Sequence, residues 1–440
     1  MRGFLASSIG VTCAAALALP LTLPAAAAPT KAPARAAQPT SSARSAPTAA
    51  EPDLPGSTQS LPLTPTTRDR TLGAAPEQGL TRDDVHRFAL VGVTWTDPDT
   101  ELRGRVQVRT RATGTGEWSG WQDVDTHNED HGADPGTAER DSGHVRGSTA
   151  PLWVGDSDAV DVRVRADRGA TRAVEPQASA LPTGLHLELV DPGAEPPAAG
   201  ARPTARRATV LPLAATELPA LSRAATEREA VTMYGRSQPY IGPRPRIITR
   251  RGWGADEKLR EKGFVYTKKV KAVFVHHTAS GNNYSCSQAP SVIRGIYRYH
   301  VESSGWRDIG YNFLVDKCGN IYEGRAGGVA KPVLGAHTLG FNTNSMGIAV
   351  LGTFGTAKPS SAAVTAIARL SAWKLGLYGV NPRGKTYLKS GGGNLYRKGK
   401  NVRLNAISGH RDGFATECPG RQLYGKLGSA RSTSARFQGR

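Results

Sequence analysis

Long apolar runs are almost absent from this 440-residue sequence. Beyond the first 30 residues, no stretch approaches the roughly 20 consecutive apolar residues that a membrane-spanning helix needs. We therefore expect no membrane span downstream of the N-terminus. The length is sufficient for two domains, each with its own core.

The one long apolar stretch stands at the N-terminus and has the pattern of a secretory leader. Arg2 precedes an apolar run over residues 4–23, and alanines occupy positions 25–28. This order of positive, apolar and small residues is typical of a signal peptide. Pro20 and Pro24 favour a removed leader over an anchor. We predict that residues 1–28 are a signal peptide and that the protein is secreted.

Cysteine is scarce, with four residues in the whole chain. Removal of the leader leaves Cys286, Cys318 and Cys418, and an odd number in a secreted protein needs an explanation. The economical one is a Cys286–Cys318 disulfide together with a metal-bound thiolate at Cys418. A free thiol or an intermolecular bridge is the alternative.

Acidic residues are scarce in the second half of the chain. Residues 241–440 contain 32 Lys and Arg but only 9 Asp and Glu, a net charge of +23, whereas residues 1–240 carry 24 and 28, a net charge of −4. A basic surface attracts polyanions. For an exported protein, anionic cell-wall polymer is the expected partner rather than nucleic acid. The alternative is that the basic residues only keep the protein soluble.

Two segments of the first half differ in pattern. Residues 29–80 are rich in Ala, Pro, Ser and Thr, which predicts disorder. Residues 81–192 contain short alternating runs, such as Val160, Val162 and Val164 between polar neighbours. Alternation with period two indicates half-buried strands. We predict an all-β, sandwich-like domain over residues 81–192.

Two clusters in this β-domain have alternative interpretations. The tryptophans Trp118, Trp121 and Trp153 could form a platform for carbohydrate. We favour the alternative interpretation, that they fill the small core of the domain. An acidic run could bind calcium, but it lacks the spacing of a known calcium loop, so a solvated loop is favoured. Its members are Asp123, Asp125, Glu129 and Asp130.

The sequence pattern of the second half of the chain is typical of an α/β domain. Residues 193–235 are predicted to be a linker, and residues 429–440 a tail. Between them, strand patterns at residues 271–277 and 345–354 alternate with helix patterns near 289–303 and after Pro359. This order predicts a mixed β-sheet flanked by helices over residues 236–428. Residues 383–403 stand out as a basic, glycine-containing insertion.

Two distant segments offer metal ligands. An apolar strand ends in His276 and His277, and a later loop contains His410 and, eight residues on, Cys418. Neighbouring residues of a strand point to opposite sides, so only one histidine of the pair reaches a given metal, and spacing does not decide which. Three nitrogen or sulfur ligands with one open position are typical of a catalytic zinc site.

Seven short motifs in order resemble one family, the zinc-dependent N-acetylmuramoyl-L-alanine amidases and peptidoglycan recognition proteins. The resemblance covers roughly residues 245–428. Its motifs are Arg251-Gly252-Trp253-Gly254-Ala255, Val275-His276-His277-Thr278, Gly305-Trp306-Arg307-Asp308-Ile309-Gly310-Tyr311-Asn312-Phe313, Ile321-Tyr322-Glu323-Gly324-Arg325, Gly335-Ala336-His337 with Asn342 and Ser345-Met346-Gly347-Ile348, Gly409-His410-Arg411-Asp412, and Thr416-Glu417-Cys418-Pro419-Gly420.

The resemblance implies roles for individual residues. The family's zinc ligands fall on His276, His410 and Cys418, and its catalytic residues fall on Tyr311 and Thr416. The implied reaction is hydrolysis of the amide between the lactyl group of N-acetylmuramic acid and the L-alanine of the stem peptide. Family members that only recognise peptidoglycan typically lack the cysteine ligand, and a non-catalytic binding protein is the alternative function.

The resemblance also implies a peptide-binding groove. The residues expected along it are His277, His300, Trp306, Arg325, His337 and Asn342. A core position for His300 and Trp306, and a structural role for His277, are the alternatives. Animal members carry a Gly-Trp or Asn-Phe pair after the arginine, where this chain has Ala326-Gly327, so the preference for diaminopimelate or lysine stems is left open. The expected location is the cell wall outside the cell.

Overall fold

The computed structural model describes residues 56–66, 76–167, 180–194, 215–235 and 238–440. All of them belong to one structural unit, Pro52–Arg440. The predicted signal peptide and residues 29–55 of the predicted disordered segment lie outside the described residues. Within the described part of the chain, no helix is both long and apolar enough to cross a membrane.

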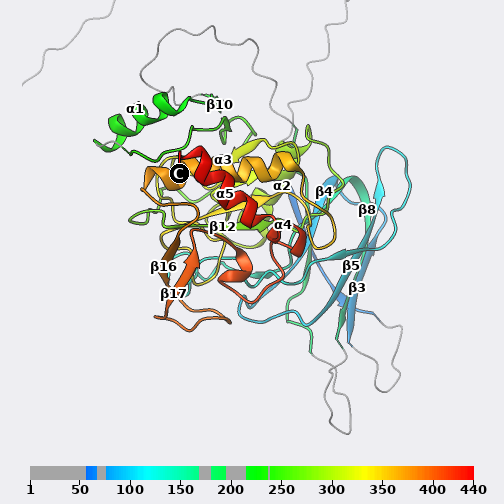
Figure 1. Ribbon diagram of the computed structural model, residues 1–440. Coiled ribbons are helices and arrows are strands. Elements are labelled where there is room, and N and C mark those ends of the chain that lie inside the picture. The colour runs from blue at the N-terminus through cyan, green and yellow to red at the C-terminus, as the bar shows by residue number, and fades with distance from the viewer. Residues whose placement is uncertain (1–55, 67–75, 168–179, 195–214, 236–237) are drawn as a thin grey trace, which may run out of the picture. The chain divides into compact units, whose positions relative to one another are not determined.

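The N-terminal domain is an antiparallel β-structure (Figure 1). Its strands are β1 (Thr58–Pro62), β2 (Thr64–Pro65), β3 (Glu77–Arg82), β4 (Phe88–Trp95), β5 (Gly104–Ala112), β6 (Gln122–Val124), β7 (Gly147–Ser148), β8 (Leu152–Ala166) and β9 (His186–Val190). The main strand order is β1-β9-β4-β8-β3-β2, with β5 and β6 extending from β8 and β7 pairing with β4. The predicted all-β class is confirmed.

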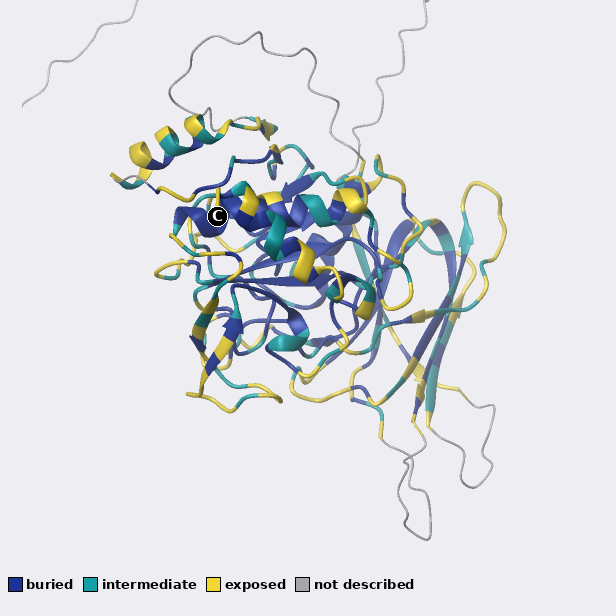
Figure 2. Cartoon of the chain, in the orientation of Figure 1, coloured by how far each residue is buried: buried dark blue, intermediate teal, exposed yellow. Residues whose placement is uncertain are grey.

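Alternation of apolar and polar side chains explains the long strand β8. Val160, Val162 and Val164 are at most 2% exposed and join the domain core, while the intervening Arg163 and Arg165 lie outside it. Period-two burial of this kind is what a pleated strand with one covered face requires. Figure 2 shows the same contrast between buried and exposed positions along the strands.

Strands β1 and β2 and most of β3 lie within residues 29–80, which the sequence predicts to be disordered. β1 is held by pairing with β9, from Thr58 opposite Val190 to Pro62 opposite His186. The pairing is long-range, so the Pro- and Thr-rich composition of these residues did not reveal it. The described residues 56–66 and 76–80 are therefore ordered parts of the sheet, contrary to the prediction.

In the structure, the members of the tryptophan cluster differ from one another in burial, and so do the members of the acidic run. Trp153 is 6% exposed and packs in a core cluster, as the favoured reading predicts. Trp118 is exposed, and the Arg109 guanidinium lies over both Trp118 and Trp121. In the acidic run, Asp123 pairs with Arg105 at the surface, but Asp130 is fully buried. The solvated-loop interpretation is wrong for Asp130.

The second domain contains a seven-stranded mixed sheet in the order β10-β11-β14-β13-β15-β12-β18. The strands are β10 (Glu217–Leu218), β11 (Ile247–Ile248), β12 (Ala272–His277), β13 (Phe313–Val315), β14 (Ile321–Glu323), β15 (Ser345–Val350) and β18 (Ile407–Gly409). β12 runs parallel to both β15 and β18, while β13 and β14 form an antiparallel hairpin. The predicted mixed sheet with helices is confirmed.

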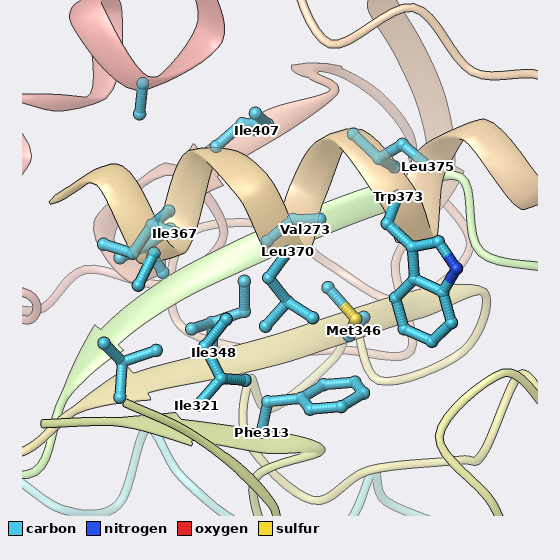
Figure 3. Packing of buried hydrophobic residues seen from close by; sticks show 14 of the residues in the cluster. Val273, Phe313, Ile321, Met346, Ile348, Ile367, Leu370, Trp373, Leu375 and Ile407 are labelled. Atoms are coloured by element: carbon cyan, nitrogen blue, oxygen red, sulfur yellow. The ribbon is translucent and has the colours of Figure 1, made fainter. Parts of the chain in front are cut away.

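Helices cover both faces of this sheet. On one face α3 (Ser361–Leu377) packs against the strands, with Ile367, Leu370 and Trp373 in the same buried cluster as Val273 and Ile348 (Figure 3). The Ser360 hydroxyl accepts the Ala363 N–H at 3.0 Å and so caps the start of α3. The opposite face is covered by α2 (Ala289–Arg298), which continues into the π-helical turn η1 (Tyr299–Ser303).

Two ranges predicted to lack structure contain helices. The predicted linker, residues 193–235, includes β10 and α1 (Arg223–Tyr234), which starts where the Ser222 hydroxyl accepts the Ala225 N–H. The predicted tail, residues 429–440, forms most of α5 (Leu427–Phe437). The Ser434 hydroxyl and the Gln438 amide donate to carbonyls of α3, at 2.9 Å each. Packing on α3 therefore orders this polar helix.

The predicted basic insertion is a hairpin of β16 (Lys385–Lys389) and β17 (Asn401–Asn405). Its inner side chains Leu388, Val402 and Leu404 pack against Phe274 and Phe341 of the domain. Its basic side chains line the outer surface around residues 395–400. Two further short helices, η2 (His410–Asp412) and α4 (Arg421–Tyr424), flank the segment that contains Cys418.

Candidate metal centre

Strand pairing brings the two ligand-bearing segments together. β12 and β18 are parallel neighbours, with Val275 opposite Gly409. Their next residues, His276 and His410, therefore emerge at the same end of the sheet. The two Nδ1 atoms lie 3.1 Å apart, and the Cys418 Sγ lies 3.8 Å from the His276 Nδ1. All three side chains are at most 4% exposed.

A fourth residue, His131, completes a compact group of donor atoms. One ligand atom from each of His131, His276, His410 and Cys418 lies within 4.8 Å of the others, and all four residues are buried. His131 comes from the N-terminal domain and was missed at the sequence level. The only local signal was its position at the end of the acidic run, next to Asp130, which was read as a solvated loop.

The second ring nitrogen of each histidine has a polar partner. The His276 Nε2 lies 3.3 Å from the Thr338 hydroxyl, and the His410 Nε2 lies 3.2 Å from the Asp130 carbonyl oxygen. The His131 Nδ1 lies 2.6 Å from the Asp130 carboxylate. Metal-ligating histidines usually donate their other N–H to such partners, which orients the ring and fixes the tautomer.

Burial also favours the neutral, metal-binding form of the imidazoles. Burial, with the neighbouring His410, lowers the pKa of His276 well below its usual value, and burial lowers the pKa of His410 to about 3. Burial, reinforced by Asp130, raises the pKa of the Cys418 thiol well above its usual value. A bound cation opposes that effect by stabilising the thiolate.

This donor set fits zinc. Imidazole nitrogen and cysteine thiolate are both zinc ligands, and protein zinc sites of four ligands are almost always tetrahedral. Among the buried side-chain atoms of the described residues, the His131 Nε2 has no hydrogen-bond partner. A buried polar atom without a partner is costly, and coordination of an ion at the centre of the group would satisfy it.

Tyr311 and Thr416 both border the group. The Tyr311 ring centroid lies 5.6 Å from that of His276, and Tyr311 is 4% exposed. Burial, reinforced by Cys418 and Asp130, raises the pKa of Tyr311 well above its usual value, so its hydroxyl stays a hydrogen-bond donor. The Thr416 hydroxyl accepts the Cys418 N–H at 3.1 Å.

His277 points away from the donor group. Its Nδ1 accepts the Phe354 N–H at 3.3 Å, and burial lowers its pKa to about 4. The structure therefore distinguishes the two histidines that strand alternation left undecided. His277 lines a cavity of about 20 Å³ together with Tyr311, Thr416 and Cys418, which is enough space for about one water molecule.

The other predicted groove residues gather beside the donor group and are all buried. His300 stacks on Trp306 with ring centroids 4.3 Å apart, and the His337 ring lies 5.2 Å from that of His276. Arg325 forms a two-point ion pair with Glu139, and the Asn342 amide donates to Asp134. The remaining predicted pair, Cys286 and Cys318, forms a disulfide.

Comparison with known proteins identifies the family of this chain. Residues 266–421 match the family model described as N-acetylmuramoyl-L-alanine amidase. Peptidoglycan-recognition protein SC2 of Drosophila simulans is 30% identical over 183 residues, which is 41% of this chain and 84% of that protein. This chain belongs to the amidase and peptidoglycan recognition protein family. The candidate ligands His276, His410 and Cys418 all lie inside the amidase match.

Further relatives are similar to this amidase-family chain over a comparable share of its length. Peptidoglycan-recognition protein SC1a of Drosophila melanogaster is 33% identical over 187 residues, 41% of this chain and 83% of that protein. The solved complex of peptidoglycan recognition proteins LCa and LCx with tracheal cytotoxin aligns at 30% identity, with a TM-score of 0.33, over 41% of this chain and 93% of that chain.

The N-terminal domain matches a different family model. Residues 39–183 match the family described as Rv3811 N-terminal galactose-binding domain-like. His131, Asp134 and Glu139 lie in this match. Two matched regions of different families therefore contribute side chains to one buried group in this amidase-family chain.

Proposed function

We propose that this protein is a secreted, zinc-dependent N-acetylmuramoyl-L-alanine amidase that acts on peptidoglycan at the cell wall. The observation that carries the proposal is the buried group of His276, His410 and Cys418 with the Tyr311 ring beside it. The retained cysteine supports a hydrolase over a non-catalytic recognition protein. The amidase-family membership and the named relatives support peptidoglycan as the polymer.

The chain's own residues would perform separate tasks. Zinc, when bound by His276, His410 and Cys418, supplies Lewis acidity toward an amide carbonyl and toward water. The Tyr311 hydroxyl would donate a hydrogen bond to the carbonyl oxygen as negative charge develops on it. A preorganised donor of this kind contributes roughly 3–4 kcal/mol to stabilising a transition state. Thr416 would hold the cysteine loop in place through the Cys418 N–H.

The groove residues would bind the stem peptide. Arg325 presents a planar guanidinium that pairs with a carboxylate through two hydrogen bonds, and stem peptides carry carboxylates. The Asn342 amide and the stacked His300 and Trp306 would contact the peptide backbone and the sugar. His337, whose ring lies beside that of His276, and His277, which lines the small cavity beside Tyr311, would help to position it.

Incubation of the full chain with purified sacculi tests the proposed reaction. The Glu139→Gln variant is included because the Glu139 carboxylate pairs with Arg325, the residue proposed to bind a carboxylate of the stem peptide. Mass spectrometry should detect stem peptides with a free L-alanine amino group and glycan with an intact lactyl group. Introducing Cys418→Ala into the Glu139→Gln background should abolish release. Binding without release from any variant would contradict the amidase and leave a recognition protein.

A further inference from the structure

One segment of the N-terminal domain covers the candidate metal centre and the groove. We define residues 128–139, which lie between β6 and β7, as the covering segment. The Leu339 N–H donates to the Asp130 carbonyl at 2.9 Å, and the Gly132 N–H donates to the Ala336 carbonyl at 3.2 Å. These backbone bonds fasten the segment along the loop that contains His337 and Asn342.

The covering segment places carboxylates on two predicted groove residues. Glu139 and Arg325 are joined by two hydrogen bonds of 2.8 Å, and both side chains are at most 5% exposed. The Asp134 carboxylate accepts from the Asn342 amide at 2.6 Å and from the Gly340 N–H at 2.8 Å. Glu139 and Asp134 of the segment therefore accept hydrogen bonds from Arg325 and Asn342, the same donors that a carboxylate of a bound peptide would use.

His131 approaches the metal group from the same segment. Its Nδ1 lies against the Asp130 carboxylate, and its buried Nε2 has no hydrogen-bond partner. A carboxylate on one ring nitrogen and a free lone pair on the other are the usual preparation of a metal-ligating histidine. The adjacent Gly132 has a φ of 120°, which L side chains rarely adopt, and the chain bends at this point, just after His131.

A fourth protein ligand changes what the centre can do. Catalytic zinc sites keep one coordination position for water or substrate, whereas sites with four protein ligands are closed. The cavity that remains beside Tyr311 has a volume of about 20 Å³, which admits about one water molecule and no peptide. Segment and ligand together leave no room for a substrate.

We propose that the covering segment is a built-in inhibitor, with His131 as a fourth metal ligand and Glu139 as a substitute for the substrate carboxylate. The segment must leave the groove before the enzyme can act. The consequence for catalysis rests on the amidase function proposed above, but the ligand role of His131 does not. Occupation of the site by the chain itself keeps the secreted enzyme latent.

The first test uses the full chain loaded with cobalt(II), whose visible absorption reports on the ligands of the metal. Acetohydroxamate serves as a small added ligand. The control is His144→Ala, at an exposed histidine five residues beyond the segment. In the wild type and in this control the spectrum should not respond. In His131→Ala the spectrum should shift and saturate. A wild type that responds like His131→Ala would overturn the ligand assignment.

A second variant leaves all four candidate ligands in place. Glu139→Gln should speed removal of the cobalt by a chelator by at least about tenfold, because it breaks a buried ion pair that closes the segment. Asp141→Asn, at an exposed position nearby, is the matched control and should behave as wild type. Equal removal rates in Glu139→Gln and Asp141→Asn would contradict the role of the ion pair.

Release of peptides from sacculi then separates the two proposals. Release that rises at least about tenfold in both Glu139→Gln and His131→Ala supports inhibition. If the cobalt spectrum and the chelation rate change as expected but no variant releases peptides, the result supports a metal site closed by the segment and refutes the amidase function. Equal release from wild type and variants, with unchanged spectra, would refute inhibition and leave the amidase standing.

Discussion

The Nδ1 atoms of His276 and His410 lie 3.1 Å apart, although 134 residues separate the two histidines in the chain. Parallel pairing of β12 with β18 produces this approach, because it aligns the ends of the two strands. Cys418 then reaches the same point through the short segment after η2. The centre is thus built on the last two strands in the order of the sheet, β12 and β18, which are buried along their whole lengths.

Loss of a metal ligand should remove the increase in the free energy of unfolding that zinc binding causes. We expect Cys418→Ala to abolish stoichiometric zinc binding. In the wild type, free zinc at about a thousand times the Kd should raise the free energy of unfolding by about 4 kcal/mol, and Cys418→Ala should lose this increase. Thermal denaturation with zinc and with chelator measures it. Glu417→Gln, whose side chain is 85% exposed, should keep the full effect.

Removal of the Tyr311 hydroxyl should slow the reaction without disturbing the metal. In the Glu139→Gln background, Tyr311→Phe is expected to lower kcat by roughly 10²–10³-fold, because one preorganised donor to the developing oxyanion is lost. Zinc content should stay unchanged. Tyr387→Phe, at a residue 59% exposed on β16, is the control. A fall in zinc content that matches the fall in rate would contradict a catalytic role for the hydroxyl.

Lys374 should make stability rise with pH. Burial lowers its pKa to about 7, although Glu323 opposes the shift, whereas the unfolded lysine has a pKa of about 10.4. Between these values the unfolded state binds more protons, so the free energy of unfolding increases as pH rises from 7 to 10, by up to about 4 kcal/mol. At pH 7 and below this contribution is absent.

Urea denaturation at several pH values checks this prediction. Lys374→Met should flatten the rise between pH 7 and 10, because it removes the titrating group. Lys358→Met, at an exposed lysine, should retain the slope of the wild type. A Lys374→Met variant with the same pH dependence as Lys358→Met would show that Lys374 keeps an ordinary pKa in the folded protein.

The basic hairpin should contribute to binding of anionic wall polymer. Arg397→Gln combined with Lys400→Gln is expected to weaken binding to sacculi that retain their anionic polymer by roughly tenfold at low salt, since exposed charges attract a polyanion. The difference should shrink as salt is added. Lys258→Gln with Lys262→Gln removes the same charge from another exposed stretch and should have a smaller effect. Equal losses from the two pairs would point to net charge alone.

Much of the fold was predictable because it depends on local patterns. Alternation in residues such as Val160, Val162 and Val164 indicated the all-β domain, and the order of strand and helix patterns indicated the mixed sheet. The strands at residues 58–82 and the helix α5 were not predicted. Strand β1 is held in place by pairing with β9, and helix α5 by packing on α3. The sequences of these segments show little apolar periodicity of their own.

The candidate metal ligands His276, His410 and Cys418 were predicted from sequence motifs, since family chemistry restricts which residue types occupy those positions. Spacing alone left His276 and His277 equivalent, and strand geometry with the partner β18 separated them. His131, Asp134 and Glu139 could be found only in the folded chain. Glu139 and Arg325 are 186 residues apart, and no local period records a contact between side chains of two different domains. Residue types established the chemistry available to this protein, while long-range packing determined that one domain closes the site of the other.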